Sequence, residues 1–108
     1  MMIDGRTVYF KESFTTQLAL IQEYASQFSP KKARQLTTAI ATHALDVIAV
    51  NPFIFAEYPG RPTPEKAYRR AIYKRRYVII YKVTANQINF LVIYHTSQNP
   101  DTVILGED

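Results

Sequence analysis

The fold is decided by residues 68–100, which read YRRAIYKRRYVIIYKVTANQINFLVIYHTSQNP. Two uninterrupted apolar runs, Val78–Ile80 and Phe90–Ile93, are typical of strands that are covered on both faces. We expect a tight hairpin turn between them at Ala85-Asn86, because Asn tolerates the left-handed backbone that such a turn needs. The strands that this stretch predicts are residues 68–73, 77–84 and 87–96.

Two amphipathic helices are predicted before these strands, at residues 13–28 and 30–50. Ser29-Pro30 separates them, since Ser supplies an N-cap side chain and Pro suits the first helical position. Pro52 ends the second helix, because the residue before a proline disfavours helical geometry. The predicted core-facing stripe of the first helix is Phe14, Leu18, Ile21, Ala25 and Phe28. That of the second helix is Ala33, Leu36, Ile40, His43 and Val47, widened by Ala44 and Ile48.

The remaining segments complete a predicted α+β fold. Residues 7–10 form a short strand, residues 51–66 contain four prolines and form a connecting loop, and residues 97–108 form a tail. We expect the two helices to form an antiparallel hairpin on one face of a small, mainly antiparallel sheet, in the order β-α-α-β-β-β. The other face needs a cover, which the apolar tail residues 103–105, a partner chain or a substrate would supply.

Length and composition predict a single globular domain over residues 1–108. The chain contains no cysteine, which excludes disulfides, thiolate catalysis and cysteine-ligated zinc. No apolar run approaches the ~18 residues of a membrane span, and the first residues lack the features of a secretion signal. We therefore expect a cytoplasmic protein without membrane contact. The 13 basic against 9 acidic residues favour acidic partners.

A dense basic cluster lies in and after the first of the three strands. Five of the eight residues at positions 69–76 are basic, and tyrosines are interleaved with them. Such a surface is typical of contact with a polyanion. If the polyanion is a nucleic acid, its bases can stack on the tyrosines. Alternatively, the cluster is a solvated hairpin tip and the tyrosines are half-buried strand residues. Strand alternation places Arg69 and Arg70 on opposite faces of the sheet. The residues expected to contact an anion are Arg69, Arg70, Lys74, Arg75 and Arg76.

Three further side chains are weighed as site residues. His95 ends the last predicted strand, where it either has a functional role or bonds the backbone. His43 lies on the apolar stripe of the second helix, which favours a structural role. Glu65 lies in the proline-rich loop, which favours a solvated acid. Because no other His, carboxylate or Cys accompanies either histidine at metal-ligand spacing, we predict no metal site and no cofactor.

Seven short motifs follow one another along residues 8–100. They are V-x-F (Val8, Phe10), I-x-x-Y (Ile21, Tyr24), S-P-x-x-A (Ser29, Pro30, Ala33), N-P (Asn51, Pro52), Y-R-R (Tyr68, Arg69, Arg70), Y-V-I-I-Y (77–81) and H-T-S-Q-N-P (95–100). In this order and spacing they resemble the RelE/ParE superfamily of bacterial toxins from type II toxin-antitoxin modules. The resemblance implies a small toxin that an acidic antitoxin protein, encoded beside it, neutralises. An extended acidic peptide along the helix hairpin and over the sheet would cover both its apolar and its cationic surface.

The resemblance implies one of two targets. Members similar to RelE cleave messenger RNA in the ribosome without a metal, whereas members similar to ParE poison DNA gyrase and lack the cleavage residues. For cleavage, Tyr94 or His95 would supply a proton and the basic cluster the positive charge. Val78 stands where cleaving members carry Arg, and residues 96–98 lack the Arg that gyrase-type members often have. The candidate catalytic residues are Arg69, Arg70, Arg76, Tyr94 and His95.

Three functions stay open on these grounds. The chain is a growth-inhibiting toxin that binds DNA gyrase without catalysis, a metal-independent endoribonuclease that acts on the ribosome, or a toxin-fold protein that only binds its antitoxin. Val78 weakens the second function, and the basic cluster weakens the third. The gyrase target is slightly favoured.

Overall fold

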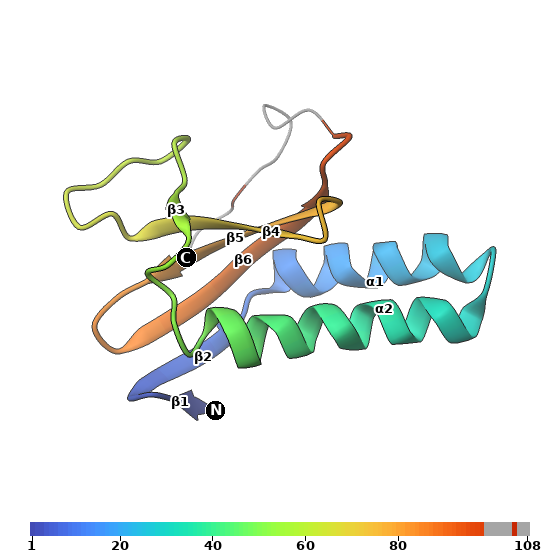
Figure 1. Ribbon diagram of the computed structural model, residues 1–108, viewed down its shortest axis with the longest axis horizontal. Coiled ribbons are helices and arrows are strands. Elements are labelled where there is room, and N and C mark those ends of the chain that lie inside the picture. Colours follow the sequence, from blue (N-terminus) through green and yellow to red (C-terminus); the bar gives the residue numbers. More distant parts are fainter. Residues whose placement is uncertain (99–104, 106–108) are drawn as a thin grey trace.

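The computed structural model describes residues 1–98 and Leu105, which form a helix hairpin packed on a twisted sheet (Figure 1). Within this part of the chain the sheet has six strands in the order β1-β2-β6-β5-β4-β3. The strands are β1 (Met2–Ile3), β2 (Arg6–Phe10), β3 (Ala56–Glu57), β4 (Tyr68–Tyr73), β5 (Tyr77–Val83) and β6 (Gln87–His95). β2 runs parallel to β6, and every other neighbouring pair is antiparallel. The predicted α+β fold with a mainly antiparallel sheet is confirmed.

Two edge strands are additions to the predicted topology. β1 precedes the predicted first strand, and β3 lies inside the segment that was predicted to be loop throughout. Each has two residues, which is too short for a period-2 pattern to be read from a sequence. They form because β2 and β4 otherwise present unpaired backbone groups at the sheet edges.

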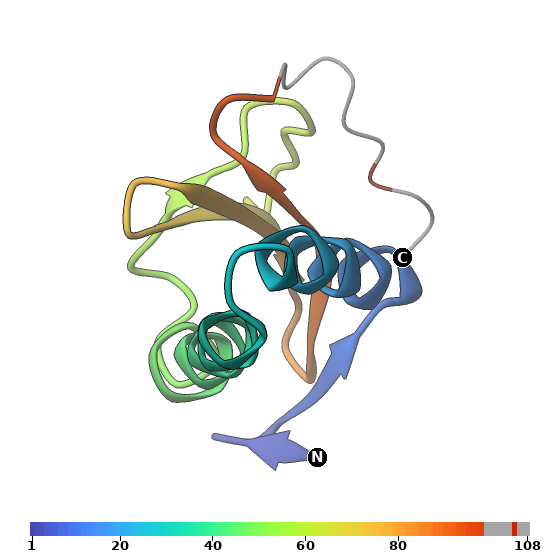
Figure 2. The same cartoon turned by 90° about the vertical axis from the view of Figure 1, so that its right-hand side faces the viewer.

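The helix hairpin lies on one face of the sheet, with both helices on the same side (Figure 2). α1 covers Glu12–Ser26 and α2 covers Pro30–His43. Ser29 caps α2 as predicted, because its Oγ accepts a hydrogen bond from the Lys32 N–H at 3.2 Å. A side-chain bond also joins the two helices, as the Thr37 hydroxyl donates to Gln22 Oε1 at 2.8 Å.

The second helix does not continue in α geometry to residue 50, as the sequence predicts. It changes at His43 into a π-helix, η1 (Ala44–Ile48), in which the Ala49 N–H bonds the Ala44 carbonyl at 2.9 Å. The wider turn rotates the residues that follow it. Ile48 and Ala49 are therefore buried, whereas Val47, predicted to face the core, is 38% exposed.

The main core lies between the helices and the sheet. Phe14 of α1 contacts Phe10 and Phe90, with ring centroids 5.4 and 5.9 Å away. A bulge shapes the strand below it, because Ile80 pairs with Val92 while Tyr81 pairs with Phe90, so Leu91 has no partner across β5. The Leu91 carbonyl instead accepts a hydrogen bond from the Ser13 hydroxyl of α1.

A second, smaller core covers the opposite face of the sheet, which we call the outer face. Its buried members are Ala67, Tyr68, Val78, Ile80, Leu91, Val92, Tyr94 and Leu105. Of the tail residues predicted to cover this face, Leu105 is only 7% exposed and packs here. Val103 and Ile104 lie outside the described residues.

The left-handed backbone expected in the β5–β6 turn is found in the β4–β5 turn instead. The β5–β6 turn lies at Ala85-Asn86 as expected, but Thr84 holds it, since the Gln87 N–H bonds Thr84 Oγ1 at 3.1 Å. Within residues 1–98, the only adjacent pair of non-glycine residues with positive φ is Lys74 (51°) and Arg75 (60°), in the β4–β5 turn. These two residues have the positive φ of a type I′ turn, which the Arg76 N–H closes by bonding the Tyr73 carbonyl at 3.1 Å. Because Tyr73 pairs with Tyr77, three residues connect the two strands. The prediction that Asn86 supplies the left-handed conformation is therefore wrong.

Candidate functional site

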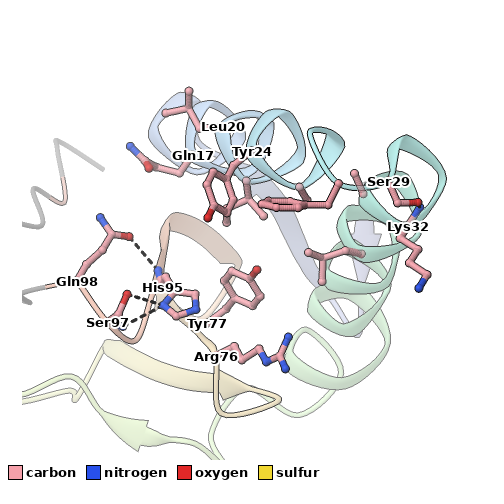
Figure 3. A pocket seen from close by; sticks show the side chains of 15 residues that line it. Gln17, Leu20, Tyr24, Ser29, Lys32, Arg76, Tyr77, His95, Ser97 and Gln98 are labelled. Atoms are coloured by element: carbon pink, nitrogen blue, oxygen red, sulfur yellow. Dashed lines mark hydrogen bonds between the residues drawn. The ribbon is translucent and has the colours of Figure 1, made fainter.

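A groove of about 810 Å³ lies between the helix hairpin and the sheet ends (Figure 3). The end of α1 and the start of α2 form one wall. The other wall begins at the β4–β5 turn and continues through the start of β5 and the end of β6. The polar and aromatic residues of this second wall are Arg76, Tyr77, His95, Ser97 and Gln98. The groove therefore joins segments that are distant in the sequence.

Aromatic rings stand on both walls of the groove. On the helical wall, Tyr24 and Phe28 meet edge to face with centroids 5.6 Å apart, and they are 66% and 76% exposed. On the sheet wall, Tyr77 and His95 are also perpendicular, at 5.5 Å. Phe28 was predicted to end the core-facing stripe of the first helix, but it lies beyond the end of α1 and points into the groove instead. An edge-to-face pair leaves ring faces open to a further partner.

Backbone contacts fix the orientation and tautomer of His95. The Ser97 N–H donates to His95 Nδ1 at 3.0 Å, and the Ser97 hydroxyl lies 2.7 Å from the same atom. Because a backbone N–H can only donate, Nδ1 is the acceptor and the neutral ring carries its proton on Nε2. The His95 N–H itself donates to Gln98 Oε1 at 2.9 Å. With Nδ1 accepting from Ser97, the neutral His95 ring presents its Nε2–H as a hydrogen-bond donor on the side away from Ser97.

The charge of the groove is positive. Lys32 and Arg76 line it from opposite walls, and no Asp or Glu is among the described residues that line it. Both cations are exposed. The groove therefore combines an apolar floor, aromatic rims and cationic donors, which suits an anionic partner with apolar or aromatic parts.

The other candidate catalytic residues do not lie in this groove. Arg70 pairs with Ile80 across β4 and β5, so it lies on the outer face with Tyr94. Burial raises the pKa of Tyr94, the nearby Tyr58 adds to this effect, and Arg70 opposes it. The structure thus brings Arg76 and His95 together on one side of the sheet, and Arg70 and Tyr94 on the other.

Arg69 uses its guanidinium to hold the backbone on both sides of β3. Its Nε donates to the Lys66 carbonyl at 3.0 Å, and its Nη1 donates to the Phe53 and Phe55 carbonyls at 3.1 and 2.8 Å. Its guanidinium also lies 5.1 Å from the centroid of the Phe53 ring. As strand alternation predicts, Arg69 and Arg70 face opposite sides of the sheet.

The remaining weighed residues lie apart from the groove. Lys74 and Arg75 form the exposed tip of the β4–β5 turn, and Glu65 is exposed in its loop. His43 packs against Tyr73 with ring centroids 4.8 Å apart, and its buried Nε2 has no hydrogen-bond partner. Burial lowers the pKa of His43. These contacts give His43 a structural place between α2 and β4.

Two findings concern the described residues as a set. Within residues 1–98 and 105, no three His, Asp or Glu side chains gather closely enough to hold a metal ion. No helix among them has the length and apolar character needed to cross a bilayer.

Sequence reasoning missed the helical wall of the groove. Leu20 and Tyr24 lie four residues apart, beside the predicted core-facing stripe, and Phe28, which was predicted to belong to that stripe, follows at the same interval. This second apolar stripe was a usable signal, because large apolar side chains that continue past the core-facing stripe are expected to meet a partner. Lys32 had no comparable signal, since single lysines are common on helix surfaces.

Comparison with known proteins agrees with this architecture. The fold is similar to that of a chain in the chromosomal ParDE toxin-antitoxin system of P. aeruginosa, with a TM-score of 0.68, 17% identity, and 84% of this chain and 96% of that chain covered. It is also similar to a chain of the E. coli DinJ-YafQ toxin-antitoxin complex, with a TM-score of 0.50, 19% identity, and 84% and 92% covered. No curated protein sequence matches significantly. Residues 8–100 match the sequence profile of the ParE toxin of the type II toxin-antitoxin system parDE. Because that match spans nearly all of the described fold, the chain belongs to the ParE family of type II toxins.

Proposed function

We propose that this toxin inhibits growth by binding DNA gyrase without catalysing a reaction, and that an acidic antitoxin neutralises it. The observation that carries the proposal is the division of the candidate catalytic residues between two faces of the sheet. Arg76 and His95 line the groove, whereas Arg70 and Tyr94 lie on the outer face. Phosphodiester cleavage needs a base, an acid and a cation within reach of one phosphate.

The protonation of the individual groups supports the same proposal. The fixed tautomer of His95 offers a donor at Nε2 and leaves no free acceptor nitrogen on the neutral ring. Burial raises the pKa of Tyr94, so its hydroxyl is a weaker acid than in water. Arg69 already donates to three backbone carbonyls. A binding mechanism needs none of these groups to exchange a proton.

The groove is the surface that we assign to the antitoxin. Its apolar floor includes Ile21 and Leu36, and Lys32 and Arg76 stand on opposite walls. An amphipathic segment with carboxylates along its edges would bury the apolar side chains and pair with both cations. The solved relatives named above come from toxin-antitoxin systems, which is consistent with such a partner.

Inducible expression in bacteria tests the target. We expect growth arrest with an SOS response, intact messenger RNA in primer extension, and inhibition of gyrase supercoiling by the purified toxin. The variant His95→Ala should retain gyrase inhibition, because the proposed mechanism gives it no proton to transfer. Cleavage of messenger RNA within codons, abolished by His95→Ala, would contradict the proposal.

A second candidate, ribosome-dependent cleavage of messenger RNA, rests on one specific observation. Arg76 and His95 line the same groove, and the Tyr77 ring lies beside the His95 ring. These three residues would supply a cation, a proton donor and a stacking surface to an RNA strand. Primer extension on cells that express the toxin alone separates this candidate from the gyrase target, because only RNA cleavage creates new ends within codons. Co-expression of the antitoxin should remove those ends.

A further inference from the structure

We infer that the groove also binds a single strand of nucleic acid, without cleaving it and in competition with the antitoxin. The inference goes beyond the proposed function, because neither gyrase inhibition nor antitoxin binding requires the toxin to hold a strand. It uses the groove already described and assigns it a second occupant of different chemistry.

The groove carries a cation on each of its two walls. Lys32 lies on the helical wall and Arg76 on the sheet wall, so a phosphate chain spanning the groove meets a cation on each side. The His95 Nε2–H adds a neutral donor beside Arg76. Phosphate oxygens accept hydrogen bonds from all three groups.

The aromatic rings of the groove suit the bases of a nucleic acid. The apolar side chains of an amphipathic antitoxin segment would cover the same rings, so the rings fit both occupants, and the binding assay with single strands separates the two. Tyr24 projects from one wall, and Tyr77 stands on the other (Figure 3). Phe28 also lines the groove and is 76% exposed. Bases stack on such rings regardless of their identity, and positive charge that follows the backbone completes the usual surface for single strands.

The two occupants would compete, since both need Lys32 and Arg76. A toxin held by its antitoxin would then have its strand-binding surface covered, and release of the antitoxin would expose it. Covering the groove would thereby prevent contact with nucleic acid.

Fluorescence anisotropy with labelled (dT)15 and (U)15 tests the inference on purified, antitoxin-free toxin. We expect both probes to bind at 50 mM salt, with a linear fall of log affinity against log salt concentration. The double variant Lys32→Gln/Arg76→Gln should lower the magnitude of that slope by about 1.4, since each phosphate contact on a single strand contributes about 0.7. Tyr24→Ala should weaken binding on the order of tenfold at every salt concentration, through lost stacking.

Matched variants control for general charge and general aromatic loss. Lys31→Gln/Arg34→Gln removes two cations from the same molecule, and neither residue lines the groove. Tyr9→Ala removes an exposed ring on β2, outside the groove. Both controls should change the affinity less than twofold beyond the long-range effect of net charge. Thermal melting of all variants confirms that each is folded.

Several results would overturn the inference. They are failure of both probes to bind at 50 mM salt, an equal loss of slope in the two double variants, and an equal loss of affinity in Tyr24→Ala and Tyr9→Ala. Binding of an acidic peptide but of neither strand would make the groove a protein site only. Gyrase inhibition measured on the same proteins separates strand binding from the proposed function. Inhibition without strand binding overturns this inference and leaves the proposed function standing. Strand binding without inhibition overturns the proposed function and leaves this inference standing.

Discussion

Replacement of Arg69 by alanine is expected to destabilise the toxin without touching the groove. The side chain donates three hydrogen bonds to the carbonyls of Lys66, Phe53 and Phe55 and stacks on the Phe53 ring. Each bond contributes about 1 kcal/mol and the exposed cation–π contact about 0.5 kcal/mol. Two of the three bonds are exposed, so water replaces part of them, and the net loss should be about 2 kcal/mol.

Urea denaturation followed by circular dichroism measures this loss. We expect a lower midpoint with an unchanged slope, because the surface exposed on unfolding stays the same. Arg69→Lys should recover less than half of the loss, since a single ammonium cannot reproduce the planar fork of donors. Arg70→Ala removes the same charge from the next residue on the other face and should cost under about 0.5 kcal/mol.

The reasoning fails if Arg69→Ala costs less than about 0.5 kcal/mol, or if Arg70→Ala costs as much. The comparison also affects how toxicity is interpreted. A loss of growth inhibition in an Arg69 variant would reflect a loosened loop and a smaller folded population, not a missing catalytic group. Only variants of Arg76 and His95 test chemistry in the groove.

Three further predictions concern stability. Burial holds the pKa of His43 below its ordinary value of 6.5 in the folded protein, so the unfolded chain binds the proton more readily. The free energy of unfolding should therefore fall as the pH drops below about 6.5. In His43→Leu, urea denaturation at several pH values should show a weaker dependence of stability on pH. Tyr81→Phe removes a buried hydroxyl that donates to the Pro52 carbonyl at 2.7 Å, and calorimetry should show a loss of about 1–2 kcal/mol. Replacing Lys74-Arg75 by Asn-Gly puts the preferred type I′ residues at two positive-φ positions and should stabilise the protein by about 1 kcal/mol in calorimetry. Binding of partners to the groove should not change. A loss of stability would show that Lys74 and Arg75 are not strained in this turn.

The larger elements of the fold were predictable because their signals are local. The Ser29-Pro30 junction marks the turn of the helix hairpin, and the apolar runs within residues 77–96 mark two strands. The π-turn after His43 was not predictable, since its benefit lies in the packing of Ile48 and Ala49 against the rest of the core. The bulge at Leu91 likewise depends on a distant helix, because the Leu91 carbonyl accepts a hydrogen bond from the Ser13 hydroxyl of α1.

The candidate site was predictable only in part, for a related reason. Alternation along one strand correctly separated Arg69 from Arg70. The neighbours Tyr94 and His95, either of which was predicted to supply a proton, lie on opposite faces of the sheet. Tyr24 and Lys32 join Arg76 only when three segments of the chain meet, so no spacing in the sequence places them in one groove.

The parallel pairing of β2 with β6 affects how the protein folds during its synthesis on the ribosome. Thr7 pairs with Gln87 and Phe10 with Phe90. β2 is synthesised early, but it can pair with β6 only after residues 87–90 have been synthesised. β6 also lies between β2 and β5, which makes it the centre of the sheet. Contacts between such distant residues form late, because a long loop must close before they can contribute. A nascent chain that ends before β6 can pair β3, β4 and β5, but β2 is not yet connected to them, because β6 lies between β2 and β5. His95, Ser97 and Gln98 of the groove are then also missing. The groove is therefore complete only when nearly the whole of the described chain has been synthesised.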